Sequence, residues 1–274
     1  MTLRDLSAGD PSAADPLVAR LRAAGCVFAE EEAALLLAAD DSPARVEALV
    51  ARRVAGEPLE TILGWADFAG VRVVCAPGVF VPRQRTALMV RLAATLLSDG
   101  GRVLDLGCGT GAIGAAVAVR APSLEVWAVD VDPAAVACAR LNLPADRVLL
   151  GDLYEPLPAA MRFDVILANA PYVPTGEIAL MPPEARDHEH RVALDGGADG
   201  LDVQRRAIAG APVRLSPHGA VLVETGRRQS EATARLMRAA GLEARIETDD
   251  EIGGTVVVGT MTEVVHPPPV DDLP

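Results

Sequence analysis

The sequence predicts an α/β protein built on an open, mostly parallel sheet of seven strands, with a small helical domain in front of it. After Gly101, short runs of strand character alternate with alanine-rich runs of helical character, which is typical of a sheet covered by helices on both faces. The last two expected strands are joined only by residues 249–254, too few for a crossover, so the last strand should be antiparallel. Half of the residues are hydrophobic, which supplies enough apolar material for a packed core.

The first part of the chain, residues 1–55, is expected to form a small helical domain. Asp15-Pro16 has the form of an N-cap followed by proline at the first helical position. Residues 29–39 begin with glutamates, which favour a helix N-terminus, and continue as an apolar run. Ser42-Pro43 repeats the cap-and-proline signal and begins a helix that Gly56 stops.

The composition of the sequence changes at residues 56–82, where prolines and glycines separate short runs such as Val71–Val74. This pattern predicts a hairpin and a linker. A catalytic domain is expected over residues 83–262, and the proline-rich, acidic tail at 263–274 is expected to be flexible. The strands expected in the catalytic domain are 102–106, 125–130, 147–150, 164–169, 220–224, 243–248 and 255–260. The helices expected there are 86–97, 112–120, 133–141, 202–214 and 229–240.

The composition excludes several classes of function. The chain has 25 basic residues, all of them arginine, which excludes mechanisms that need a lysine. With 38 acidic residues the formal net charge is −13, which disfavours nucleic acid as the main partner. No apolar run approaches the roughly 20 residues of a membrane span, and residues 1–10 lack the apolar stretch of a secretory signal. The four cysteines form no C-x-x-C pair, so a reducing, cytoplasmic location is expected.

The first candidate motif covers residues 103–114, where a buried strand enters a glycine-rich turn and then a helix. Glycines at such a turn let the backbone approach a ligand closely. The spacing also satisfies G-x-G-x-x-G, so a dinucleotide site has to be considered. An acid directly before the loop disfavours a pyrophosphate and favours a ligand with ammonium and sulfonium groups, such as S-adenosylmethionine. The candidate cofactor-binding residues here are Asp105, Gly107, Cys108, Gly109, Thr110 and Gly111.

Further acids follow the next two expected strands. Asp130 ends the second strand about twenty positions past the glycines, a place suited to hydrogen bonding with ribose hydroxyls, and Val131 lies beside it. Asp132 precedes a proline and is better explained as a helix N-cap. After the third strand, Asp152 is placed to accept from an adenine amino group and Leu153 to pack on the ring, with an exposed surface acid as the alternative for Asp152.

The candidate catalytic residues are Asn169, Ala170, Pro171 and Tyr172, which close the fourth expected strand. A planar amide or aromatic amine is a poor nucleophile because its lone pair is delocalised. The Asn169 side-chain oxygen and the Ala170 carbonyl can accept both N–H hydrogens and so direct that lone pair at an electrophile. Pro171 stiffens the turn and Tyr172 packs on the planar group. A purely structural turn is the alternative, and the preceding glycine loop and Asp130 weigh against it.

Two other features are not expected to be functional sites. Histidines two positions apart in His188-Glu189-His190 do not share a helix face, so no metal is expected. Cys108 lies inside the glycine loop, where a small side chain lining the cofactor site is the better explanation than a reactive thiol.

These motifs resemble those of class I S-adenosylmethionine-dependent methyltransferases that act on planar nitrogen. More narrowly, the chain resembles the protein N(5)-glutamine methyltransferases (HemK-type), typified by the release-factor enzyme. The resemblance covers roughly residues 55–260. Besides the motifs above, it rests on 56–59, 62–64, 68–70, 77–79, 81–83, 194–197, 199–201, 224–226 and Gln229.

The chain departs from the family pattern at three places. Ala170 replaces the first proline of the usual Asn-Pro-Pro-Tyr. Residues 84–87 read Gln-Arg-Thr-Ala where the family shows Pro, acid, Thr, Glu, so two acids are lost and Arg85 is gained. A histidine, His190, replaces the proline of a Glu-Pro-Arg sequence. These departures leave the expected chemistry intact and bear on which protein is the substrate. They are typical of a paralogous branch rather than of the housekeeping release-factor enzyme.

The resemblance implies a class I methyltransferase fold, S-adenosylmethionine as cofactor and S-adenosylhomocysteine as product. It also implies a protein substrate that carries a glutamine, such as a peptide chain release factor, recognised by the N-terminal helical domain. N6-adenine methylation of nucleic acid is the alternative among enzymes, because the same Asn-x-Pro-Tyr handles exocyclic amines. A non-catalytic NAD-binding module is the alternative from another class. Neither a membrane nor a metal is expected as a partner.

Overall fold

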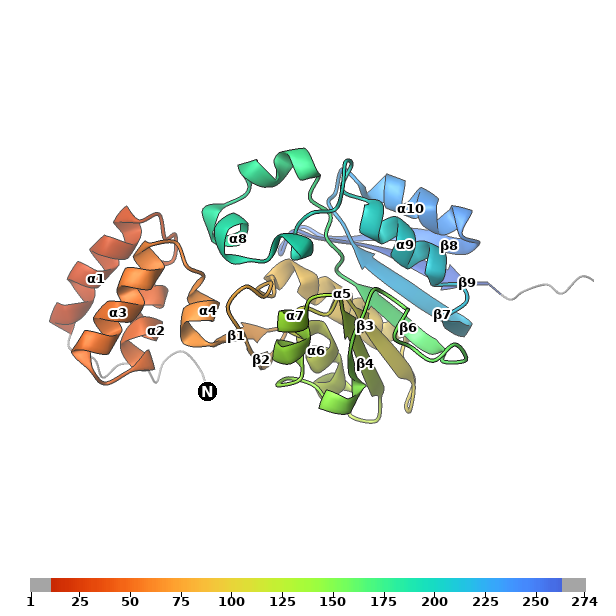
Figure 1. Cartoon of the computed structure of the whole chain (residues 1–274), viewed down its shortest axis with the longest axis horizontal. Helices are drawn as coiled ribbons and strands as arrows, with labels where there is room; N and C mark the ends of the chain where they lie inside the picture. Colours follow the sequence, from red (N-terminus) through yellow and green to blue (C-terminus); the bar gives the residue numbers. More distant parts are fainter. Residues whose placement is uncertain (1–10, 263–274) are drawn as a thin grey trace, which may run out of the picture.

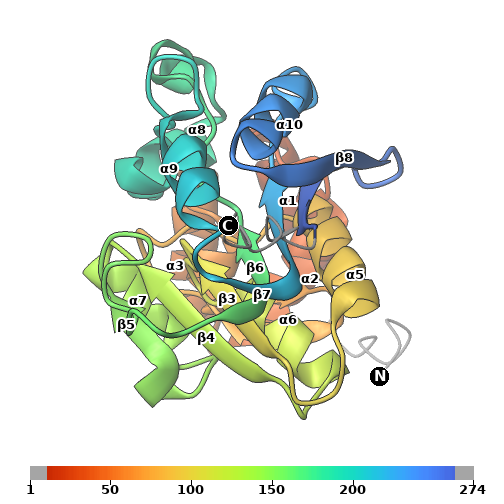
Figure 2. The ribbon, with the colours of Figure 1, turned by 90° about the vertical axis from the view of Figure 1, so that its right-hand side faces the viewer.

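The computed structural model describes residues 11–262, and a seven-stranded sheet forms its centre (Figures 1 and 2). The strands are β3 (Arg102–Leu106), β4 (Glu125–Asp130), β5 (Val148–Leu150), β6 (Phe163–Ala168), β7 (Leu215–Glu224), β8 (Leu242–Asp249) and β9 (Gly254–Met261). Their order is β5-β4-β3-β6-β7-β9-β8. Neighbours from β5 to β7 are parallel, whereas β9 is antiparallel to both β7 and β8. The expected fold class, with its antiparallel last strand, is confirmed. The expectations for residues 1–10 and 263–274 lie outside the described residues.

Helices cover both faces of this sheet because successive strand residues point to opposite sides. The helices are α5 (Ala87–Leu96), α6 (Ala112–Arg120), α7 (Pro133–Ala139), α9 (Asp202–Gly210) and α10 (Ser230–Ala239). On one face, Val103 of β3 belongs to a buried layer with Met89 of α5 and residues of α6 and α7. On the other face, Leu104 packs in a layer with Ile208 of α9 and Met237 of α10 (Figure 2).

Some element boundaries differ from the expected ones. The strand expected at 220–224 begins at Leu215, because its backbone continues through a Pro-His-Gly sequence that reads as a turn. His218 takes a positive φ of 62° there, and the pairing with β6 shifts register. The helix expected at 202–214 ends at Gly210, which lies against the Tyr154 ring, so that a Cβ at this position would be 2.6 Å from it.

Four helices form the N-terminal part of the described chain: α1 (Pro11–Ala23), α2 (Ala29–Ala39), α3 (Pro43–Val54) and α4 (Leu59–Leu63). They enclose a hydrophobic cluster of their own, which includes the fully buried Leu21 and Leu36. The expected start of the first helix was wrong, because α1 begins at Pro11 and Pro16 lies inside it. A proline there removes one N–H donor, and the packing of Leu17 and Leu21 in the cluster outweighs that loss.

A two-stranded hairpin, β1 (Trp65–Phe68) and β2 (Val71–Val74), connects the helices to the sheet domain, as the sequence predicts. Ala69 and Gly70 in its turn both have positive φ, as a type I′ turn requires. Phe68 and Val73 are buried in the same layer as α5 and α6, so the hairpin is packed onto the sheet domain. In the described part of the chain, no helix is long and apolar enough to span a membrane.

A buried ion cluster ties the N-terminal helices to α8 (Pro183–His188), which belongs to the sheet domain (Figure 1). Arg53 of α3 donates to both carboxylate oxygens of Glu32, at 2.6 and 3.1 Å. It also donates to Glu184 of α8 at 2.5 Å and to the Glu57 carbonyl at 3.2 Å. The side chain of Arg53 is 7% exposed, that of Glu32 12% and that of Glu184 44%. The two carboxylates therefore lie in different environments, although one arginine serves both.

This difference predicts that removing Arg53 and removing Glu184 have unequal effects on the free energy of unfolding. Arg53→Met should lower the free energy of unfolding by about 3–5 kcal/mol, because it leaves the buried Glu32 carboxylate without its cation. Glu184→Gln removes a half-exposed partner and should cost less than about 1 kcal/mol. Urea unfolding of both variants, followed by circular dichroism, measures the two values, and equal losses would mean that Arg53 contributes no more through the buried Glu32 than through the half-exposed Glu184.

Candidate active site

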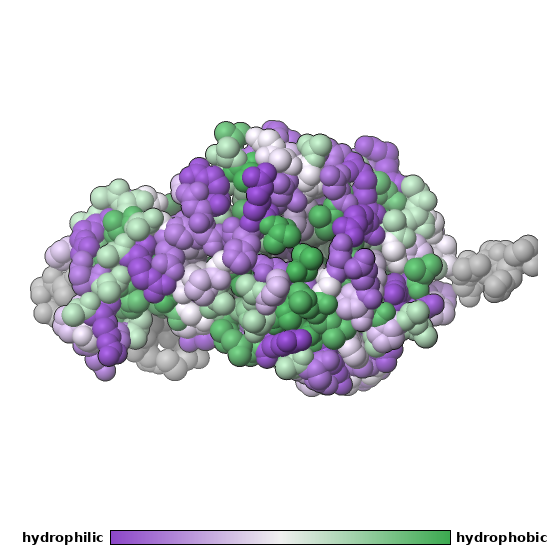
Figure 3. Space-filling model, viewed as in Figure 1, coloured by the Kyte–Doolittle hydropathy of each residue, from purple (hydrophilic) through white to green (hydrophobic). Residues whose placement is uncertain are grey.

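A cavity of about 300 Å³ lies at the carboxyl ends of β3, β4, β5 and β6. In an open α/β sheet these ends converge on one crevice, which is why residues from four strands meet there. Figure 3 shows hydrophobic residues gathered around a hollow in the middle of the viewed face. Twelve of the expected site residues line the cavity: Gly107, Cys108, Gly109, Thr110, Asp130, Val131, Asp152, Leu153, Asn169, Ala170, Pro171 and Tyr172.

The glycine loop is braced against the neighbouring strand. Gly107 and Gly109 have φ values of 68° and 54°, which side chains rarely adopt. The N–H of Gly107 donates to the Val129 carbonyl at 2.8 Å, and the N–H of Gly109 donates to Asp130 Oδ2 at 2.8 Å. Gly111 does not line the cavity. It precedes α6 with positive φ, and a Cβ there would lie 2.9 Å from the side chain of Leu143.

Asp105 is completely buried inside β3, behind the glycine loop, and does not line the cavity. Its Oδ2 accepts from the Gly114 N–H at 2.9 Å, and its Oδ1 has no hydrogen-bond partner within the described residues. Burial, together with the nearby charge of Asp130, raises the pKa of this carboxyl to about 7. The sequence identified the acid but not its depth, because burial depends on the helix that packs over it.

Asp130 and Asp132 have separate tasks at the end of β4. Asp130 uses both oxygens for the backbone, accepting from Gly109 as above and from the Asp132 N–H at 2.9 Å, and burial raises its pKa. Each oxygen keeps a second lone pair that can accept from a ligand. Asp132 accepts from the Ala134 N–H at 2.8 Å, so its expected role as the N-cap of α7 is confirmed. Its other oxygen lies 2.5 Å from His190 Nδ1.

Asp152 and Leu153 lie at the cavity after β5. Arg206 of α9 donates to Asp152 Oδ2 at 2.6 Å, so the carboxylate is engaged by a cation that itself lines the cavity. Leu153 takes a positive φ of 50°, an unusual conformation for a bulky residue. Asp152 is therefore paired with a cation through one of its oxygens, and its role toward an adenine amino group stays a prediction.

Asn169 and Ala170 directly follow β6, and the side chain of Asn169 makes one long hydrogen bond to the cavity wall. Its Nδ2 donates to Thr86 Oγ1 at 3.4 Å, and Thr86 is buried in the cavity wall. The amide oxygen of Asn169 is then left for a ligand. Ala170 is buried, so its small side chain fits where the resemblance leads one to expect a proline.

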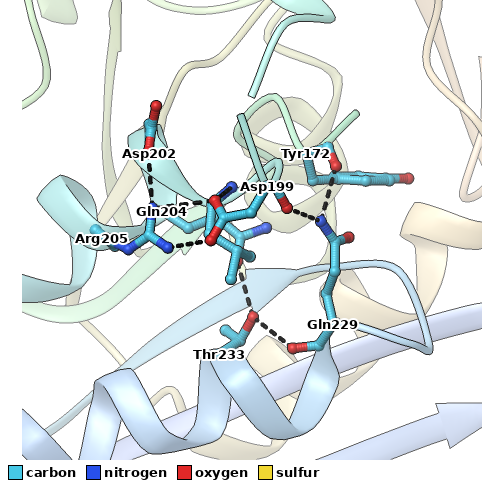
Figure 4. Close-up of polar contacts among 8 residues, drawn as sticks. Tyr172, Asp199, Asp202, Gln204, Arg205, Gln229 and Thr233 are labelled. Carbon is cyan, nitrogen blue, oxygen red and sulfur yellow. Dashed lines mark hydrogen bonds and ion pairs between the residues drawn. The ribbon is translucent and has the colours of Figure 1, made fainter. Parts of the chain in front are cut away.

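Tyr172 is held through its backbone, as Figure 4 shows, and also through its phenol oxygen. Its backbone carbonyl accepts from Gln229 Nε2 at 3.0 Å, and the same nitrogen donates to the Asp199 carbonyl at 3.0 Å. Its phenol oxygen accepts from Arg85 Nη2 at 2.7 Å and donates to Glu224 Oε1 at 3.3 Å. Burial, with a contribution from Glu224, raises the pKa of the phenol to about 12, so Tyr172 keeps its proton at neutral pH.

Several residues around the cavity were not assigned a site role from the sequence. Arg85 and Thr86 lie on a short 3-10 helix, η2 (Gln84–Thr86), and reach residues more than 80 positions away. Phe80 and Arg206 also line the cavity, and Gln229 lies behind it. The family pattern drew attention to residues 84–87 and to Gln229, but nothing local in the sequence indicates which side chains they contact.

In the His188-Glu189-His190 sequence, Glu189 and His190 make hydrogen bonds within the protein. Glu189 accepts from the Val81 N–H at 3.0 Å and from Arg83 at 2.7 Å, and His190 meets Asp132 as described above. Between residues 11 and 262, no three His, Cys, Asp or Glu side chains are grouped to hold a metal ion. Burial raises the pKa of the Cys108 thiol well above its ordinary value, so this thiol stays protonated rather than nucleophilic.

Comparison with known proteins shows which family this chain belongs to. Residues 70–181 match the model of the methyltransferase small domain. The chain is 40% identical over 215 residues to the release factor glutamine methyltransferase of Geobacter sulfurreducens, covering 77% of this chain and 75% of that protein. It is 41% identical over 245 residues to the protein of the same name from Bordetella pertussis, covering 84% and 90%.

The chain belongs to the release factor glutamine methyltransferase family. Solved structures agree on the fold: a methyltransferase from Pyrococcus furiosus has a TM-score of 0.53 at 19% identity, covering 70% of this chain and 89% of that chain. The 16S rRNA N2 G1207 methyltransferase of T. thermophilus has a TM-score of 0.52 at 22% identity, covering 72% and 50%.

As a member of this family, the enzyme is an S-adenosylmethionine-dependent methyltransferase, and its cavity fits that donor. A Cβ at Gly107 would meet nothing within 4 Å, so the loop presents open backbone to a ligand. The Asp130 carboxylate, which lines the cavity, keeps an acceptor lone pair on each oxygen for the donor, whereas the unpartnered Oδ1 of Asp105 is buried behind the loop. The residues present therefore match the ligand that the family uses.

The raised pKa of Asp105 predicts a specific pH dependence of stability. The folded chain holds this proton up to about pH 7 and the unfolded chain only up to about pH 4. The contribution is therefore complete below about pH 4 and is lost as the pH rises toward 7, by at most about 1.4 kcal/mol per pH unit. Asp105→Asn keeps an acceptor for Gly114 and removes the titration, so its stability relative to the parent should increase through this range. Urea unfolding across that pH range measures the difference, and parallel profiles would contradict the assignment.

Proposed function

We propose that this chain methylates the side-chain amide nitrogen of a glutamine in a peptide chain release factor, with S-adenosylmethionine as the methyl donor. The observation that carries the proposal is that Asn169 and Tyr172 line the same cavity as the glycine loop. The names of the relatives support a release factor as the substrate. We assign recognition of this protein to the helical domain at residues 1–55, with a linker at 56–82 and the catalytic domain at 83–262. The four buried, unpaired cysteines support a cytoplasmic location.

The catalytic part of the proposal rests on orientation of the target amide. Asn169 Oδ1 and the Ala170 carbonyl accept its two N–H hydrogens, which directs the nitrogen lone pair toward the donor. Thr86 supports this role because it occupies Asn169 Nδ2 and leaves the oxygen for the substrate. Tyr172 packs on the planar amide, and Pro171 stiffens the turn between them.

Methyl transfer then needs no strong base. Bound S-adenosylmethionine supplies a methyl group that is activated by the sulfonium charge. The nitrogen–carbon bond forms in line as the carbon–sulfur bond breaks, and the nitrogen afterwards releases its extra proton to water. Positioning of reactants supplies on the order of 7–11 kcal/mol in well-oriented systems. The residues around Asn169 therefore act by holding the amide rather than by exchanging protons with it.

The experiment that tests the function incubates the purified enzyme with its own organism's release factor and labelled S-adenosylmethionine. We expect one methyl group on one glutamine, located by mass spectrometry of the release factor. Parallel incubations contain DNA or RNA in place of the protein. Label in adenine of the nucleic acid, with none in the protein, would instead support adenine methylation, which the net charge of −13 disfavours.

Asp130 is assigned to the ribose hydroxyls of the donor. Asp130→Ala should weaken its binding by about 1.5–3 kcal/mol, the range for a hydrogen bond to a charged group. Asp130→Asn keeps one acceptor oxygen and should lose less. Calorimetry with S-adenosylhomocysteine measures both, and an unchanged affinity in a folded Asp130→Ala variant would contradict the role.

Asn169 is assigned to the transition state more than to binding. Asn169→Ala should lower kcat by roughly 10²-fold or more, as for loss of one preorganised polar group, with little change in donor affinity. Asn169→Asp keeps the acceptor but buries a charge beside the target amide, so its rate should fall between those of Asn169→Ala and the parent. Steady-state kinetics with the release factor measures these rates. Near-parental turnover of Asn169→Ala would mean that the turn is structural.

A further inference from the structure

Arg85 occupies a position in the cavity wall that connects two otherwise separate elements. Its Nη2 donates to the Tyr172 phenol oxygen at 2.7 Å, and its Nε donates to Glu224 Oε1 at 3.2 Å. The guanidinium carbon lies 5.9 Å from the centroid of the Tyr172 ring. Arg85 thus links η2 to the turn after β6 and to the end of β7.

Glu224 makes this contact electrostatically important. Its side chain is only 1% exposed, whereas that of Arg85 is 41% exposed. Glu224 Oε1 accepts from both Arg85 and Tyr172, while Oε2 has no hydrogen-bond partner within the described residues. A buried carboxylate is costly unless a cation and hydrogen bonds compensate it. Arg85 supplies that cation, and the Tyr172 hydroxyl is hydrogen-bonded to both members of the ion pair.

Tyr172 is consequently fixed from two sides. Gln229 holds its backbone carbonyl (Figure 4), and the ion pair holds its phenol oxygen. A tyrosine whose backbone carbonyl and phenol oxygen are both held has little freedom to rotate its ring out of the cavity wall. We propose that Arg85, paired with Glu224, is a positioning residue that fixes the Tyr172 ring against the target amide. This inference rests on the proposed function, because it concerns the same acceptor site.

The sequence indicates that this device is particular to the present chain. At position 85 the family pattern has an acid, and an acid there could not neutralise Glu224. Glu224 itself lies in a stretch that matches the family pattern, so the change at position 85 is what gives this buried carboxylate an arginine partner. Arg85 itself lines the cavity, so the test has to separate an effect that passes through Tyr172 from a direct contact with the substrate.

The test compares Arg85→Met, Arg85→Lys, Glu224→Gln and the double variant Arg85→Met/Glu224→Gln. Arg91→Met is a matched control, because Arg91 is a nearby, similarly exposed arginine whose ion pair with Asp249 lies away from the cavity. For each variant, kcat and KM with the release factor are measured, together with the affinity for S-adenosylhomocysteine. The chain contains two tyrosines, so NMR of protein labelled with ¹³C in the tyrosine rings gives one set of signals for each.

We expect Arg85→Met to lower kcat about tenfold, a smaller effect than loss of a group that contacts the substrate directly, with unchanged cofactor affinity. The Tyr172 ring signals should shift, whereas those of Tyr154, which donates to the Ala207 carbonyl, should stay in place. Arg85→Lys should recover part of the rate because it restores the charge. The double variant should be no slower than Arg85→Met, since both changes act through one contact. Arg91→Met should match the parent in every measurement.

Three results would overturn the proposal: parental kcat in Arg85→Met, a lower kcat with unmoved Tyr172 signals, or additive losses in the double variant. If Arg85→Met fails to fold, Arg85→Lys and the double variant still decide, because neither leaves a buried charge without a partner. A parental enzyme that does not methylate the release factor would contradict the proposed function alone. The Tyr172 signals would then still show whether Arg85 positions the ring.

Discussion

The Asp130 carboxylate is the contact on which the arrangement of the site depends. Its two oxygens accept from Gly109 in the glycine loop and from Asp132 at the start of α7. A single side chain at the end of β4 therefore fixes the loop after β3 and the turn into the next helix. Asp132 extends the connection to His190, and His190 N–H donates to the Gly78 carbonyl at 2.8 Å. Three walls of the cavity are thereby joined through one strand end.

The sequence could predict the sheet, the glycine loop and the convergence of Asp130 with Asn169 because these follow from local periodicity and from strand order. It could not predict the contacts of Thr86 or Arg85, since each depends on residues more than 80 positions away. It also placed Pro16 at a helix start, because the packing that holds α1 together is not visible in the local pattern. Local signals thus identify elements, and long-range packing decides which side chains face the cavity.

The ion cluster around Arg53 shows how the N-terminal helices are connected to the cavity. Arg53 reaches Glu184 on α8, and the segment that contains α8 also carries Met181 and Val192, which line the cavity. A side chain of the helical domain is thus one helix away from the cavity wall. The segment that borders the cavity is therefore anchored to the N-terminal helices through a buried arginine.

The three departures from the family pattern occupy very different surroundings. Ala170 is buried, and the role proposed for it uses only its backbone carbonyl, which a smaller side chain leaves in place. His190 lies so close to Gly78 that a Cβ there would be 2.4 Å from its ring, which couples these two positions. Arg85 is coupled to Glu224 through charge. Gly78 and Glu224 both lie in stretches that match the family pattern, so each of these two changes meets a residue that the pattern already supplies, and neither change alters the glycine loop.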